Sequence, residues 1–273
     1  MDRRAKLYVL LMMAPAVAIF GAFFLLPLAR LAISSAAGPS GFKIYLLSLT
    51  NPRYFATLIN TMILSIAVTL VTLMISGFSG VFLTRNQFPG KSFIVSLLTF
   101  PLAFPGVVVG FMIILLVGRQ GLFGDITNWL MGEKVVFAYS MIGLFLGYLY
   151  FSIPRVILTI MAAAEKLDPS LEEAARSLGA SPLKVIKDVL IPALVPGLIS
   201  SGAICFATSM GAFGTAFTLA TDIDVLPIVI YTEFTLLANI STAAALSIVL
   251  GLITWVALSV ARTISGTTVA SAG

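Results

Sequence analysis

The chain has no histidine, a single cysteine and few charged side chains, which make up 10% of its 273 residues. The absence of histidine excludes His-ligated zinc sites and the Ser-His-Asp and Cys-His catalytic groups. One cysteine cannot form an internal disulfide. Because Cys205 lies inside an apolar run, we expect it to be a small, buried hydrophobic side chain.

The chain is rich in apolar residues, which form 59% of it and give a mean hydropathy of +1.10. Soluble domains carry roughly 25% charged residues, so this composition predicts an integral membrane protein. The apolar runs predict one all-α transmembrane domain over residues 1–273 with six spans. The expected spans are residues 7–28, 57–83, 92–117, 135–158, 194–220 and 241–261.

The first span follows a short basic head, residues 1–6. A cleaved signal peptide has a similar outline, but the run is long enough to span a membrane, which favours a signal anchor. Six spans place both termini on the cytoplasmic side. Only five of the sixteen basic residues then lie outside, in agreement with the excess of Lys and Arg on cytoplasmic loops. These five are Arg30, Lys43, Arg53, Arg119 and Lys134.

The chain also lacks a phosphate-binding loop of the form G-x-x-x-x-G-K-[ST]. Its Gly-Lys pair is Gly90-Lys91, and Arg85 occupies the position that the pattern reserves for glycine. We therefore predict that the chain itself neither binds ATP nor acts as an enzyme.

Two spans carry features of a transport pathway. Two prolines in the segment 100–106 predict a broken helix, and free backbone groups are tolerated at membrane depth only inside protein or beside a water-filled cavity. A proline kink that serves packing alone is the alternative. In the fifth span, hydroxyl side chains are candidates for lining the pathway, although bonding to their own helix is the commoner fate of Ser and Thr. We expect the pairs Gly106/Gly110 and Gly143/Gly147 to be helix contacts.

Residues 226–239 are moderately apolar but short, and Glu233 interrupts them. Burying a carboxylate at mid-membrane costs about 2.5–3.5 kcal/mol. We therefore predict an interfacial or re-entrant helix on the outer side.

The longest polar interval, residues 162–193, predicts two short helices in the cytoplasm. Asp168 is a good N-cap, and Gly179 is placed to end the first helix in the left-handed conformation. Ser181-Pro182 repeats the cap-plus-proline signal. The first helix has a narrow face of mostly small apolar residues, which fits a groove on another protein; folding back on the chain's own helices is the alternative. This face consists of Leu171, Ala174, Ala175 and Leu178.

The same interval resembles the EAA loop of permease subunits in binding-protein-dependent type I ABC importers. Glu173-Ala174-Ala175 is followed by Gly179 and then by residues 189–192, which end in proline. Val189 and Ile191 are aliphatic departures from the family's Ile-x-Leu-Pro. The resemblance implies that this loop is the coupling helix that docks on a separate ATPase. The residues implied are Glu173, Ala174, Ala175, Leu178, Gly179, Val189, Ile191 and Pro192.

The resemblance also implies the partners of the chain. These are an ABC ATPase dimer that binds ATP and magnesium, a second permease subunit that is identical or homologous, and an extracytoplasmic solute-binding protein. We expect the chain to bind no cofactor, metal or nucleic acid itself and to be located in the bacterial inner membrane. Candidate residues lining the pathway are Asn60, which belongs to an Asn-Thr pair common in the family, and Pro101, Pro105, Ser209, Phe213 and Thr215.

The overall look is closest to permeases of the polyamine, ferric-iron, thiamine and phosphonate importers, and the expected solute is a polyamine (spermidine/putrescine-type) or a similar small solute. The outer carboxylates Asp222, Asp224 and Glu233 would suit a cationic solute, unless they are ordinary solvated surface. Many relatives carry an acidic residue where this chain has Ala212, so ion-specific contacts do not carry over. The alternative function is an ion-gradient-driven secondary transporter or channel, which would need coupling charges in the spans. A membrane-embedded enzyme comes last, because the catalytic residue types are missing.

Overall fold

The computed structural model describes residues 3–219 and 223–269, and within these ranges the chain is all helical, with no strand. The predicted fold class is thereby confirmed. Six stretches of helix in these ranges are long and apolar enough to cross a membrane. They are Leu11–Ala36, Pro52–Arg85, Gly106–Met131, Met141–Glu165, Pro182–Met210 and Ile240–Gly266.

The chain forms two compact units. The core unit comprises residues 56–228 and 252–273, and the N-terminal unit comprises residues 1–55 and 229–251. Helices α4, α13 and α14 contribute residues to both units. Each unit is described here by itself.

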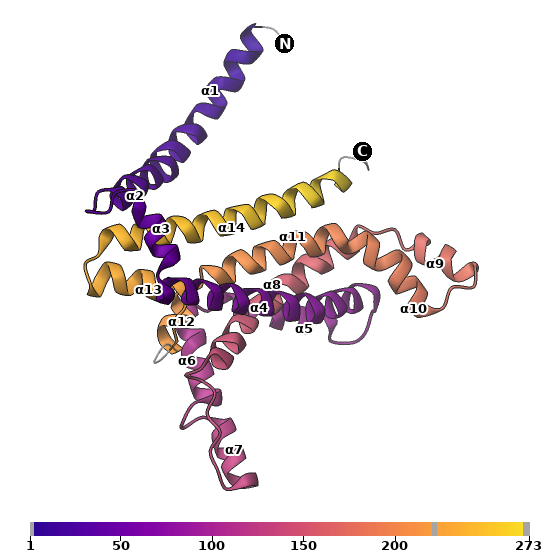
Figure 1. Ribbon diagram of the computed structural model, residues 1–273. Helices are drawn as coiled ribbons and strands as arrows, with labels where there is room; N and C mark the ends of the chain where they lie inside the picture. The colour runs from indigo at the N-terminus through magenta and orange to yellow at the C-terminus, as the bar shows by residue number, and fades with distance from the viewer. Residues whose placement is uncertain (1–2, 220–222, 270–273) are drawn as a thin grey trace. The chain divides into compact units, whose positions relative to one another are not determined.

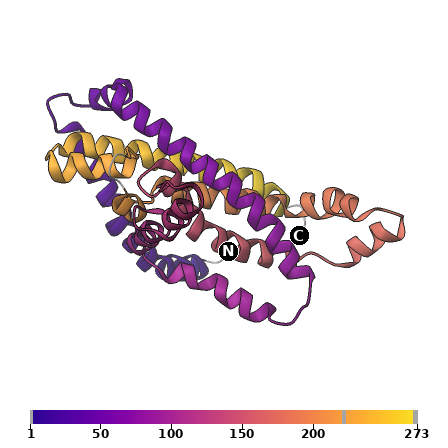
Figure 2. The same cartoon turned by 90° about the horizontal axis from the view of Figure 1, so that it is seen from below.

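The core unit contains the polar loop and the broken helices. Its elements are α4 (Pro52–Arg85), α5 (Lys91–Thr99), a 3-10 turn (Phe100–Ala103), α6 (Gly106–Val117), α7 (Leu122–Met131), α8 (Met141–Glu165), α9 (Ser170–Ser177), α10 (Pro182–Val185), a π turn (Ile186–Leu190), α11 (Ile191–Met210), α12 (Gly214–Leu219) and the first residues of α13 (Leu226–Tyr231). The end of α14 (Ile240–Val269) also belongs to it. Figure 1 shows α8 and α11 side by side, with α9 and α10 beyond their ends; Figure 2 shows this protrusion from below.

Small residues let the helices of the core unit approach closely, as expected for membrane helices. A Cβ atom on Gly110 would lie 2.6 Å from Thr218 Cβ in α12, and one on Gly147 would lie 2.7 Å from Thr215 Cγ2. These two glycines are helix contacts, as predicted. Gly143 differs, because the atoms nearest to it are the carbonyl groups of the preceding loop. Cys205 is 2% exposed and lies in the hydrophobic core, which confirms its expected role.

Several helices begin or end away from the expected boundaries. Helix α8 begins at Met141 rather than near residue 135, because Ser140 is extended and its side chain accepts a hydrogen bond from Gly143 N at 3.4 Å. The loop expected after residue 117 contains the helix α7, which ends at Gly132 with φ +76°. Helix α14 continues past Arg262, where the last span was expected to end.

The N-terminal unit begins with α1 (Arg3–Phe20), which passes through a π turn (Gly21–Leu25) into α2 (Leu26–Ala36), beyond the expected end at residue 28. Helix α3 (Lys43–Thr50) follows (Figure 1), and a second π turn (Thr232–Leu236) precedes α14. Residues 226–236 are helical, as expected for this segment.

The environment of Glu233 differs from the prediction. Its side chain is 2% exposed, accepts a hydrogen bond from Tyr54 Oη at 2.8 Å and accepts another from Asn239 Nδ2 at 3.1 Å. These donors satisfy a carboxylate that the sequence placed at the outer surface.

Candidate functional site

The first helix of the polar loop, α9, is fixed at both ends by the signals read from the sequence. Asp168 Oδ1 accepts a hydrogen bond from Ser170 N at 2.9 Å, and this bond lowers the pKa of the Asp168 carboxyl group. At the other end, Gly179 adopts φ +82°. Gly179 N donates to Arg176 O at 2.9 Å and Ala180 N donates to Ala175 O at 3.1 Å. This is the Schellman arrangement, so the predicted left-handed helix end is confirmed.

The second helix repeats the cap-plus-proline start. Ser181 Oγ accepts a hydrogen bond from Lys184 N at 3.4 Å, and Pro182 is the first residue of α10. From there the chain runs through the π turn into α11, which begins at Ile191. Pro192 is the second residue of α11, but the helix is continuous from Pro182 to Met210, so its missing N–H leaves one carbonyl group of the preceding turn without a helix hydrogen bond. The loop is thus continuous with the long helices α8 and α11.

Most of the expected contact residues are exposed. The side chain of Leu178 is 89% exposed, and Ile191 is 47% exposed. Glu173, Ala174, Gly179 and Pro192 are also exposed, whereas Ala175 and Val189 are half-buried. Leu171 in α9 and Leu183 in α10 are further exposed apolar side chains. Within the described residues of the core unit, most of these side chains are therefore left unburied.

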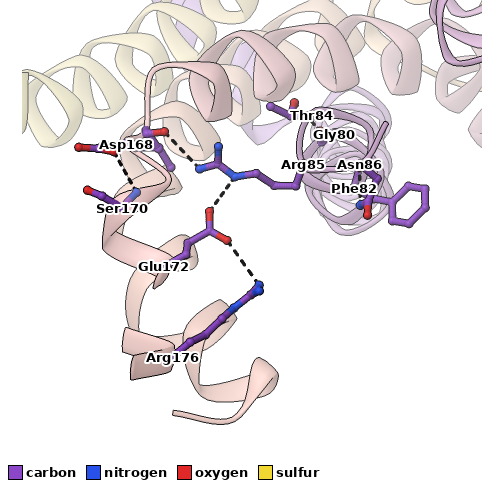
Figure 3. Close-up of polar contacts among 10 residues, drawn as sticks. Gly80, Phe82, Thr84, Arg85, Asn86, Asp168, Ser170, Glu172 and Arg176 are labelled. Atoms are coloured by element: carbon purple, nitrogen blue, oxygen red, sulfur yellow. Dashed lines mark hydrogen bonds and ion pairs between the residues drawn. The ribbon is translucent and has the colours of Figure 1, made fainter. Parts of the chain in front are cut away.

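Glu172, which the sequence reading did not include among the site residues, ties the loop to α4. Its Oε1 lies 2.7 Å from Arg85 Nε, at an angle that makes this an ion pair without a hydrogen bond. Arg85 Nη2 also donates to Leu167 O at 3.3 Å. Figure 3 shows the Arg85 side chain reaching from α4 to Glu172. Arg176, one helical turn further along α9, lies farther from Glu172, with Nη2 at 4.0 Å from Oε2.

The sequence alone does not indicate this pair. Two adjacent glutamates on a helix point about 100° apart, so they can lie in different environments. Glu172 faces the bundle and Glu173 is exposed. Its partner Arg85 is distant in sequence, and only the fold brings the two together.

The second candidate region is the place where two broken helices meet. Phe104 and Pro105 are extended between the 3-10 turn and α6, which confirms the predicted break. A second break separates α11 from α12 at residues 211–213. Thr215 Oγ1 donates to Gly106 O at 3.0 Å across these breaks, and Tyr148 Oη donates to Ala212 O at 2.7 Å.

A cavity of about 460 Å³ lies beside this junction. Pro101 and Thr215 line it, whereas Pro105 stands next to it as the N-cap of α6. Ser209 is fully buried and Phe213 is half-buried, and neither lines the cavity. Asn60 is exposed on α4 and does not line it. The structure therefore brings together two of the six expected pathway residues at this cavity.

Arg155 also lines the cavity, although its position near the end of the expected span 135–158 predicts a place at the cytoplasmic side. Because α8 begins at Met141 and ends at Glu165, Arg155 lies about 15 Å before the end of the helix. The proline that precedes it, Pro154, is inside the helix and does not end it. Arg155 is a candidate site residue that the expected span boundaries concealed.

Comparisons with known proteins agree with this geometry. The family model described as "Binding-protein-dependent transport system inner membrane component" matches residues 74–266. The molybdenum transport system permease protein ModB of Escherichia coli (strain K12) is 34% identical over 206 residues, which are 74% of this chain and 88% of ModB. The sulfate transport system permease protein CysT of the same strain is 32% identical over 186 residues, which are 64% of this chain and 62% of CysT.

A solved structure shares the fold. One chain of a bacterial alginate ABC transporter, crystallised with an alginate pentasaccharide-bound periplasmic protein, superposes with a TM-score of 0.83 at 17% identity. The match covers 96% of this chain and 95% of that one. At this identity the likeness concerns the fold alone.

Proposed function

This chain belongs to the family of binding-protein-dependent transport system inner membrane components, a permease subunit of an ABC importer rather than its ATPase, and from this premise we propose that it forms the pathway for a small oxyanion. The observation that carries the transport role is the exposed loop with Glu173, Ala174, Ala175 and Gly179, held rigid by its caps and continuous with α8 and α11.

The proposed assembly contains a separate ABC ATPase dimer, which binds ATP and magnesium. An ATPase dimer offers two grooves and this chain has one such loop, so a second permease subunit, identical or homologous, completes the complex. An extracytoplasmic binding protein delivers the solute. Both termini lie in the cytoplasm, and the complex is in the inner membrane.

The proposed substrate is an oxyanion of the molybdate or sulfate type, because the names of ModB and CysT give molybdenum and sulfate as what their systems transport. The expected polyamine substrate has no support from these relatives. One of its arguments also fails, since Glu233 is buried and hydrogen-bonded rather than available to a cation. Asp222, a second carboxylate of that argument, lies outside the described residues. Asp224 is exposed.

The mechanism follows from the connections of the loop. ATP can bias inward- and outward-facing states only if its hydrolysis cycle changes their relative free energies. A partner that holds α9 moves α8 and α11 directly, because the loop is continuous with both. It also moves α4 through the ion pair between Arg85 and Glu172. The broken helices are packed against α8 through Tyr148 and Ala212, so movement of α8 reaches the cavity.

The test is ATP-dependent uptake in vesicles that hold the purified permease, its ATPase and its binding protein. We expect uptake of labelled molybdate or sulfate, competition by the other oxyanion and no competition by spermidine. Uptake of spermidine without uptake of either oxyanion would contradict the proposed substrate. Oxyanion uptake driven by an ion gradient in the absence of ATPase would favour the secondary transporter instead.

A further inference from the structure

The cavity beside the two broken helices contains one charge that no described residue neutralises. Of the residues that line it, Arg155 alone is charged. The Arg155 side chain is exposed, and in the described parts of the chain no carboxylate lies within 4.0 Å of it. No hydrogen bond of its guanidinium group occurs there either. The positive charge is therefore available to a ligand.

The position of Arg155 within its helix suggests that its charge has a function, because a charged side chain inside a membrane-spanning helix costs free energy. It lies well inside a helix long and apolar enough to span a membrane, about 15 Å from the helix end. Charged side chains at such depths are costly and characteristically face a water-filled path or a partner. The two helix breaks that border the cavity also need a water-filled path or surrounding protein, because their non-helical backbone has unpaired polar groups.

The lining of the cavity suits a small anion. Pro101, Phe104 and Phe151 provide apolar walls, which lower the local dielectric and strengthen attraction to the arginine. The guanidinium group presents a planar fork of donors that binds two oxygens of one oxyanion at once. A volume of about 460 Å³ falls in the range of roughly 300–1,000 Å³ for small-molecule pockets.

We propose that Arg155 contacts the transported solute, a doubly charged tetrahedral oxyanion, in the cavity between the α5–α6 break, α8 and the α11–α12 break. This inference rests on the proposed function. The walls are apolar and one arginine supplies the charge, so binding is brief, as a pathway requires. Thr208, which also lines the cavity, donates its own hydroxyl to Ile204 O and Cys205 O and contributes no donor to the anion.

The first test measures uptake of labelled sulfate and molybdate by vesicles with Arg155→Gln and Arg155→Lys. We expect Arg155→Gln to lower the uptake rate about tenfold or more, and Arg155→Lys to restore part of it. The matched control is Arg262→Gln, because Arg262 lines a different cavity, of about 300 Å³, with Ser200 and Trp255. This control should transport as the wild type does. Co-purification of the ATPase checks the assembly of each variant.

A second test separates loss of charge from loss of structure. In Arg155→Cys, a positively charged methanethiosulfonate reagent restores the charge at position 155, and a negatively charged one reverses it. Cys205 is buried, so wild type treated with either reagent is the control. We expect uptake to return with the positive reagent only.

Wild-type uptake rate and KM in Arg155→Gln, or equal recovery with both reagents, would overturn the role of Arg155 and leave the proposed function standing. Failure of the wild type to transport either oxyanion would instead refute the proposed function, and this inference with it.

Discussion

Arg85, the last residue of α4, and Glu172, in the first turn of α9, form an ion pair of 2.7 Å that joins the polar loop to a helix outside the α8–α11 connection. The two side chains are 20% and 12% exposed. A pair so far removed from water is more strongly coupled than a surface pair. The loop is therefore held at three points, by α8, α11 and α4.

The first prediction concerns this pair. Arg85→Glu or Glu172→Arg should lower the free energy of unfolding by about 1–3 kcal/mol, somewhat below the roughly 3–5 kcal/mol for a fully buried pair. The double variant with exchanged charges should recover part of the loss, measured by thermal unfolding in detergent. ATP hydrolysis should become less dependent on transport in the single variants, because α4 no longer follows the loop.

Arg176→Ala is the matched control for this prediction. Arg176 lies 4.0 Å from Glu172 and its side chain is 64% exposed, so the expected loss is below about 1 kcal/mol. If the exchanged-charge variant loses as much free energy of unfolding as the two single variants lose together, the pair does not hold the loop.

The second prediction separates strain from contact at Gly179. Gly179 has φ +82°, and nothing lies within 4 Å of a Cβ built there. Gly179→Ala and Gly179→Trp carry the same backbone strain, of about 1–2 kcal/mol. Any further loss of coupled transport in Gly179→Trp therefore indicates that the tryptophan side chain clashes with the docked ATPase. Gly90, with φ +84° and equally open space, gives the control Gly90→Trp, which should keep its coupling.

The third prediction concerns the contact between α6 and α12. A Cβ on Gly110 would lie 2.6 Å from Thr218 Cβ, closer than side chains pack, so Gly110→Ala must displace α12. We expect a loss of about 1–3 kcal/mol in the free energy of unfolding, the usual cost of overpacking. Gly266→Ala, with nothing within 4 Å, should leave stability unchanged or raise it by about 0.5–1 kcal/mol. Equal unfolding temperatures for the two variants would argue against close packing at Gly110.

The fourth prediction concerns Glu233 in the N-terminal unit. Tyr54→Phe removes one donor from a buried carboxylate and should cost about 1.5–3 kcal/mol, as a hydrogen bond to a charged group does. Glu233→Gln should also destabilise the protein, while Glu133→Gln, at an exposed position, should not. Thermal unfolding in detergent measures all three. An unchanged unfolding temperature in Tyr54→Phe would mean that Glu233 does not depend on this bond.

Local signals predicted much of the fold. Long apolar runs predicted the all-helical fold class and six stretches long enough to cross a membrane, although the third is Gly106–Met131 rather than residues 92–117. The prolines at 101 and 105 located the broken helix. Asp168 and Gly179 marked the ends of α9 because capping depends on residues close in sequence.

What depends on distant residues could not be predicted in the same way. The pairing of Glu172 with Arg85 and of Glu233 with Tyr54 joins segments far apart in the chain. Arg155 was not among the expected pathway residues because the expected span ends at residue 158, whereas α8 runs from Met141 to Glu165. The helix α7 was missed because its ten residues alone are too few to form an apolar run of spanning length.

The measurement that tests the central claim most directly is purification of the tagged chain in a gentle detergent, with identification of the proteins that accompany it. The account predicts that an ABC ATPase co-purifies with the wild type and is lost from a Glu173→Arg, Gly179→Trp double variant, while Gly90→Trp retains it. A second permease in the same eluate would identify the other half of the pathway. If the wild-type chain purifies without an ATPase and still moves solute along an ion gradient, the proposed importer is wrong.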